Sequence, residues 1–160
     1  MSSTKGTLPL TACQNGIWFD QMVPQDKPFY NMGGHLRFRG PIDRDLFERA
    51  IGILIEENDA LRIVLREAGD VPEQEVLPHF RPALDYFDLS SKAGAREEWA
   101  AWMSHRIDVP FTMFGEPLFY FAFARLSDDE YSWFHVYHHL IIDAYGHSLL
   151  VQHLAGSYSS

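Results

Sequence analysis

Residues 137–146 read Tyr-His-His-Leu-Ile-Ile-Asp-Ala-Tyr-Gly, and the predicted fold extends outward from this stretch. The apolar residues before it indicate a strand, and the residues after Asp143 indicate a helix, with a tight loop between the two. Side chains of adjacent strand residues point to opposite faces, so His138 and His139 are expected to differ in burial. Loops after strands commonly carry functional groups. The stretch therefore predicts an acid–base site whose loop is fixed by Asp143.

The remaining sequence predicts an α+β fold in which helices cover a mixed β-sheet. Alternating or continuous apolar patterns predict strands over residues 35–39, 60–66, 73–77, 84–88, 118–126 and 131–138. Helical periodicity predicts a short helix after Thr11 and longer ones over residues 43–58, 91–106 and 144–158. The side chains expected to point inward include Ile17, Trp18 and Met22 in the first helix and Leu149, Leu150 and Leu154 in the last.

The composition is that of one domain. The chain has 160 residues, of which 46% are hydrophobic, and 22 acidic against 13 basic residues give a net charge of -9. This charge argues against nucleic-acid binding, which depends on neutralising phosphates. The single cysteine, Cys13, excludes an internal disulfide and a cysteine-based zinc site. No apolar run reaches the ~20 residues of a membrane span, so we expect a cytoplasmic protein with neither a nucleic-acid nor a membrane partner.

The two histidines and Asp143 leave several interpretations open. With eight histidines in the chain, the pair could be ordinary core or surface residues. Zinc accepts His and Asp ligands, but adjacent strand residues diverge and the helical HExxH pattern is absent, so we predict no metal. Arg62 is either a solvated arginine at a strand start or a buried partner of Asp143, since arginine pairs with carboxylates through two parallel hydrogen bonds.

Three segments, taken together, resemble the N-terminal half of a condensation domain of nonribosomal peptide synthetases. Residues 10–18, Leu-Thr-Ala-Cys-Gln-Asn-Gly-Ile-Trp, are similar to the opening motif of that family. Residues 58–63, Asn-Asp-Ala-Leu-Arg-Ile, are similar to its His-Glu-x-Leu-Arg-Thr string, with three substitutions. Residues 138–143 are similar to its His-His-x-x-x-Asp motif. The Gly that normally follows is Ala144, which must have an ordinary φ or carry strain.

The resemblance implies a chloramphenicol-acetyltransferase-like lobe over residues 1–160, the N-terminal (donor, His-motif) lobe of a two-lobed enzyme whose C-terminal lobe is absent. It implies an acyltransferase that forms an amide between two carrier-bound thioesters. His139 would be catalytic, and His138, Asp143, Arg62 and Ala144 would support the motif, with Asp143 paired to Arg62.

The same resemblance implies the partners. Upstream and downstream carrier domains would deliver substrates on phosphopantetheine arms, and no cofactor would bind directly. The isolated chain is expected to be inactive, with an apolar patch or sheet edge left bare. A non-catalytic carrier-docking module, an epimerisation lobe, or a lobe of another carrier-dependent acyltransferase are the alternatives.

Overall fold

The computed structural model describes residues 6–23 and 27–159. The elements, in chain order, are β1 (Leu8–Pro9), α1 (Ala12–Gln21), β2 (Asn31–Arg39), α2 (Arg44–Glu57), a 3-10 helix η1 (Asp59–Arg62), β3 (Ile63–Arg66), β4 (Glu73–Val76), β5 (Asp85–Asp88), α3 (Ala95–Ile107), β6 (Phe119–Arg125), β7 (Glu130–His138) and α4 (Ala144–Ser159). The predicted α+β class is confirmed.

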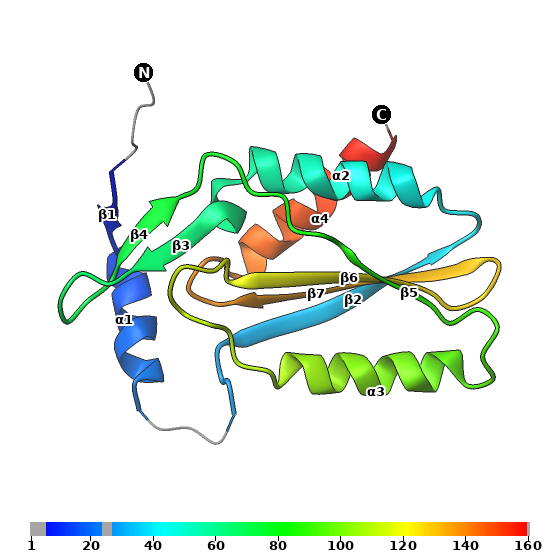
Figure 1. The fold of residues 1–160 in the computed structure, drawn as a ribbon, viewed down its shortest axis with the longest axis horizontal. Coiled ribbons are helices and arrows are strands. Elements are labelled where there is room, and N and C mark those ends of the chain that lie inside the picture. Colours follow the sequence, from blue (N-terminus) through cyan, green and yellow to red (C-terminus); the bar gives the residue numbers. More distant parts are fainter. Residues whose placement is uncertain (1–5, 24–26, 160) are drawn as a thin grey trace.

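A four-stranded mixed sheet forms the centre of the fold, with strand order β2-β7-β6-β5. The β2–β7 and β6–β7 pairs are antiparallel and β5 pairs with β6 in parallel. Helices α2 and α4 cover one face of this sheet and α3 covers the other (Figure 1). A smaller sheet, in the order β1-β4-β3, lies beside α1 at one end of the molecule.

Strand β7 is the central element of the core. All nine of its residues are buried, including the polar Glu130, Ser132, His135 and His138. This agrees with its position between a strand on each side and helices on both faces. Its two faces belong to different clusters. Trp133 and Tyr137 pack among the residues beneath α2 and α4, whereas Phe134 and Val136 pack against α3. Because β7 ends at His138, the most rigid part of the sheet supports the first histidine of the pair.

Three local predictions were wrong. Residues 59–62 form a 3-10 helix before the strand. Met22 is 65% exposed because α1 ends at Gln21, one residue before it. Leu149 is 47% exposed, although Leu150 and Leu154 are buried. Leu150 and Leu154 are four positions apart and share one helix face, whereas an adjacent residue is rotated away from that face.

Candidate active site at the end of strand β7

His138 is a buried support for the loop. Its side chain is 5% exposed and lies near the rings of Tyr30 and Phe111. The backbone N–H of Leu140 donates to His138 Nδ1 at 3.1 Å. Because Nδ1 accepts this hydrogen bond, the neutral ring carries its proton on Nε2. Burial and the neighbouring His139 lower the pKa of His138 to about 4, so the ring stays neutral near pH 7.

His139 is half-buried and has the tautomer that a general base requires. Its backbone N–H donates to the carbonyl of Tyr30 at 2.8 Å. Its Nδ1 lies 2.8 Å from the carbonyl oxygen of Ile142. A carbonyl can only accept, so Nδ1 carries the proton and Nε2 has the free lone pair. The ring lines an open groove of about 460 Å³ together with Cys13, Gln14 and Leu149. His139 can therefore accept a proton or a hydrogen bond from a group placed in this groove.

Asp143 fixes the loop by capping helix α4. Its Oδ1 accepts a hydrogen bond from the backbone N–H of Gly146 at 2.7 Å, and its carbonyl accepts from His147 at 2.9 Å. An aspartate at this position satisfies a free N–H of the first turn and interacts well with the helix dipole. Ala144 is the first residue of the helix, and none of the described non-glycine residues has a positive φ. Ala144 therefore fits the position of the motif glycine without strain.

Arg62 does not pair with Asp143, contrary to the sequence-based expectation. Its Nη1 donates to the carbonyls of Leu77 and Pro78 at 2.5 and 3.3 Å, and its Nη2 contacts Asp59 at 2.5 Å. Among the residues that the structure describes, Asp59 is its only carboxylate partner. Turn η1 brings this aspartate, three positions earlier, next to the guanidinium. Arg62 thus anchors η1 to the end of β4 and forms no hydrogen bond or ion pair with residues 139–143.

Helix α4 is also held against β7 by a pair of histidines. Nε2 of His147 lies 2.8 Å from Nε2 of His135. Burial lowers the pKa of His135 to about 3 and also lowers the pKa of His147. Both rings are therefore neutral near pH 7, and one donates to the other. This contact fixes the start of α4, and with it the end of the His139 loop, over the sheet.

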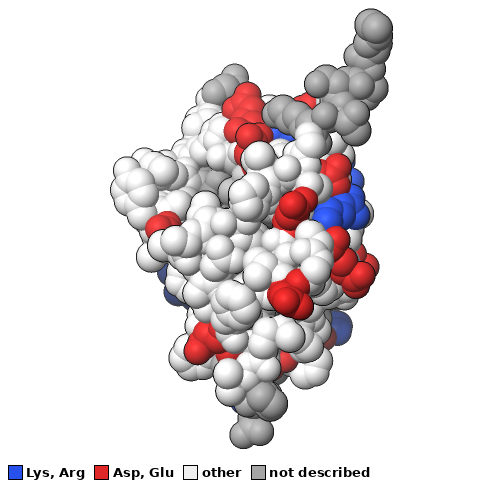
Figure 2. All heavy atoms as spheres, turned by 90° about the vertical axis from the view of Figure 1, so that its left-hand side faces the viewer, with Lys and Arg blue, Asp and Glu red and all other residues white. Residues whose placement is uncertain are grey.

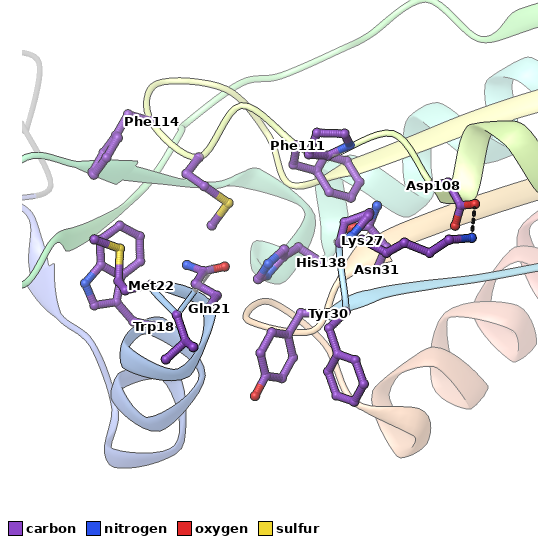
Figure 3. Close-up of a pocket in the computed structure, with 15 residues that line it drawn as sticks. Trp18, Gln21, Met22, Lys27, Tyr30, Asn31, Asp108, Phe111, Phe114 and His138 are labelled. Carbon is purple, nitrogen blue, oxygen red and sulfur yellow. Dashed lines mark hydrogen bonds and ion pairs between the residues drawn. The ribbon is translucent and has the colours of Figure 1, made fainter. Parts of the chain in front are cut away.

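A second pocket opens on the side of His138. It has a volume of about 510 Å³ and lies between α1, the segment before β2 and the loop after α3. Figure 3 shows Trp18 and Met22 on one side and Tyr30 and Phe111 on the other, with His138 between them. Several apolar side chains at this end are exposed, including Phe19, Met22, Val23 and Phe29. The face of the molecule at the α1 end shows large uncharged areas with scattered acidic groups and few basic ones (Figure 2).

Gln14 belongs to the opening motif, and no role is predicted for it from the sequence. In the structure its side chain forms a capping box with Thr11 and also contacts the carbonyl of Leu140, in the loop that follows His139. The Thr-x-x-Gln spacing is a known signature of a capping box, so the cap could have been predicted. The contact with Leu140 joins residues 126 positions apart, and no local pattern reports it.

The family model for the condensation domain matches residues 4–160, and the chain belongs to this family. The fold is accordingly the chloramphenicol-acetyltransferase-like fold of these domains.

Curated relatives and solved structures support the same family. The chain is 32% identical over 151 residues to the dimodular nonribosomal peptide synthase of Bacillus subtilis (strain 168), and the match covers 94% of this chain and 6% of that protein. It is 30% identical to the isonitrile lipopeptide synthase of Streptomyces coeruleorubidus, over 95% of this chain and 10% of that protein. A mutant starter condensation domain of rhizomide synthetase RzmA, in complex with C8-CoA, superposes with a TM-score of 0.88 at 31% identity. That match covers 96% of this chain and 35% of the other, so the chain spans about a third of a solved condensation-domain chain.

The described residues contain neither a cluster suited to a metal ion nor a helix suited to a membrane span. Among residues 6–23 and 27–159, no group of three or more His, Cys, Asp or Glu side chains is arranged to hold a metal ion. No helix within these residues is both long and apolar enough to cross a membrane.

Proposed function

We propose that the chain is the N-terminal, His-motif lobe of a condensation domain that joins two carrier-bound substrates through an amide bond. The observation that carries this proposal is the state of His139. Its Nδ1 proton is engaged by the carbonyl of Ile142, which leaves the lone pair on Nε2, and His139 lines an open groove. His138, Asp143 and Ala144 support the loop around it, and Arg62 supports the neighbouring η1–β4 junction.

The proposed reaction needs little base strength. The α-amine of the acceptor attacks the carbonyl carbon of the donor thioester, a C–N bond forms, and the C–S bond breaks to release the carrier thiol. A free α-amino group has a pKa near ~8, so about a tenth of it is already neutral at pH 7 and a strong base is not needed to supply the nucleophile. His139 would orient the amine and take up its proton as the tetrahedral intermediate collapses. Positioning can supply about 7–11 kcal/mol, and general base catalysis adds a factor of about 10²–10⁴.

Partner domains would supply the two substrates and the second wall of the active site. Upstream and downstream carrier domains would bring the two thioesters on phosphopantetheine arms, and a C-terminal lobe would close the groove. The exposed apolar residues at the α1 end and the uncharged surface there support such a cover. Alone, the chain leaves His139 partly exposed to water, which weakens charge stabilisation, and it offers one wall for two substrates. We therefore expect the isolated chain to be inactive.

The test joins the chain to the C-terminal lobe of a relative and measures amide product with both carriers loaded. His139→Ala should lower the rate at least ~100-fold and leave the circular dichroism spectrum unchanged. His105→Ala is the matched control, because His105 is an exposed histidine on α3 and does not line the groove of His139. Equal rates in the His139 variant and its control would refute the catalytic role.

A carrier-docking module without chemistry is the second candidate, favoured by the exposed apolar side chains of α1. Titrating a loaded carrier domain into the isotope-labelled chain distinguishes the two. Shifts confined to one surface patch, together with no product from the joined protein, would favour docking alone. Product above background from the chain by itself would contradict the expected inactivity.

A further inference from the structure

The side chain of Gln14 joins three separate parts of the chain. It lies in the first turn of α1, and its Nε2 donates to the carbonyl of Leu140 at 3.2 Å and to Gln74 Oε1 at 3.1 Å. Its Oε1 accepts from the backbone N–H of Thr11 at 2.8 Å and from Gln74 Nε2 at 3.2 Å. One amide therefore connects the start of α1, strand β4 and the catalytic loop.

This network fixes the orientation of the Gln14 amide. Both of its N–H groups donate and its oxygen accepts twice, so a flipped amide would place donors against donors. Gln74 is equally committed, since its Nε2 also donates to the carbonyl of Pro9 at 3.1 Å. A fully satisfied, part-buried network of this kind is rigid. The N–H that faces Leu140 is consequently held in place from two sides.

Leu140 directly follows the two histidines, and both of its backbone polar groups are engaged. Its N–H donates to His138 Nδ1, and its carbonyl accepts from Gln14. Leu140 itself is 2% exposed. Two residues later, the carbonyl of Ile142 engages His139 Nδ1. The short segment from Leu140 to Ile142 thus joins the Gln14 contact to the carbonyl that engages His139 Nδ1, and that carbonyl selects the tautomer of His139.

We propose that Gln14 is a positioning residue for His139: by holding the Leu140 carbonyl, it keeps the loop in the shape that leaves Nε2 of His139 free to accept a proton. The inference rests on the proposed catalytic role of His139 for its functional meaning. Its structural content, the dependence of the His139 tautomer on Gln14, can be measured in this chain without any catalysis.

Two variants separate positioning from helix capping. Gln14→Glu keeps an oxygen that can accept from Thr11, and glutamate is the preferred residue at this place in a capping box. It lacks the N–H that reaches Leu140. Thr11→Ala does the opposite, since it removes the hydroxyl that caps Gln14 and leaves the amide contact with Leu140. If the effect is only helix capping, Thr11→Ala is the more harmful change.

The measurement is nitrogen–proton correlation NMR of the His139 ring, with hydrogen exchange of the Leu140 and Ile141 amides. In the unchanged chain and in Thr11→Ala, we expect the Nδ1–H tautomer. In Gln14→Glu, we expect a mixture of tautomers and amide exchange about tenfold faster, the factor that one lost hydrogen bond gives. A His139 ring and loop amides that are the same in Gln14→Glu and in the unchanged chain would overturn the proposal.

A third variant tests whether Gln14 positions the loop if Gln14→Glu does not fold. Gln74→Leu leaves α1 and the loop untouched but removes the brace of Gln14, so loop amide exchange should rise severalfold, and unchanged exchange would overturn the proposal. In the two-lobed protein, Gln14→Glu should lower kcat with little change in KM for the carriers. A joined protein that makes no amide would defeat the proposed function, while the tautomer measurement would still decide the role of Gln14.

Discussion

Arg62 and Asp143 should contribute to stability independently, because the structure gives them different partners. Arg62→Met keeps the apolar stem and removes the guanidinium from the carbonyls of Leu77 and Pro78. A hydrogen bond to a charged group is worth about 1.5–3 kcal/mol. The Asp59 carboxylate is 64% exposed, so water replaces much of that ion pair. We expect Arg62→Met to lower the free energy of unfolding by about 2–4 kcal/mol.

Asp143→Ala removes a helix cap, a change that costs about 1 kcal/mol. If the two residues share no contact, the double variant should lose the sum of the single losses within about 0.5 kcal/mol. Urea melts of the four proteins at pH 7 give the coupling energy, and a parallel cycle on Arg62 and Asp59 provides a pair in contact. Coupling above about 1.5 kcal/mol between Arg62 and Asp143 would show that they form an ion pair and that the placement described above is wrong.

Three further substitutions test the packing of β7, β2 and α2. His138 keeps a pKa of about 4 when folded and about 6.5 when unfolded, so the unfolded chain binds the extra proton and stability falls as pH drops from about 6.5 toward 4. Between pH 7.5 and pH 5, His138 should account for about 2 kcal/mol of the fall in the free energy of unfolding, measured by urea melts. In His138→Asn, whose oxygen can still accept from Leu140, this contribution should disappear. An equal pH dependence in both proteins would contradict the buried neutral ring. Gly33→Ala should destabilise by about 1–3 kcal/mol, because a Cβ there would lie 2.7 Å from Ile107 Cγ1. Gly52→Ala on α2, where a Cβ meets nothing within 4 Å, should stabilise by up to about 1 kcal/mol, and thermal melts that rank the two alanine variants the other way would refute this description of the packing.

The sequence predicted the fold where periodicity and burial agree. The β6–β7 hairpin was predicted from two apolar runs around a polar turn, and α2 was predicted from its cap Asp43 and its repeating apolar face. The 3-10 turn before β3 was missed, because Ala60 and Leu61 suit a strand and the turn depends on how Arg62 is anchored. Leu149 was placed inside because α4 is apolar on more than one side, so periodicity alone could not choose the face.

The candidate site was predicted less completely than the fold, because several of its contacts join residues far apart in the sequence. His138 and His139 differ in burial, as predicted, but strand alternation is not the reason. Every residue of β7 is buried, and His139 is more exposed because it lies in the turn after the strand. Asp143 fixes the loop, as predicted, but it does not pair with Arg62, the partner that was predicted for it. Its partner is the adjacent helix N-terminus, a contact that a motif with an arginine elsewhere in the chain does not reveal. The Gln14 contact with Leu140 depends on tertiary packing and carries no local signal.

The pairing of β2 with β7 has a consequence for how the chain folds as it is made. Asn31 pairs with His138 and Arg39 pairs with Glu130, so a strand synthesised early must wait for one synthesised late. Until β7 emerges, β2 has no partner in the four-stranded sheet, and such unpaired strands expose a newly made chain to aggregation. Distant pairings of this kind also slow folding. The loop that carries His139 follows β7 directly, so the candidate site is completed in the same late step that closes the sheet.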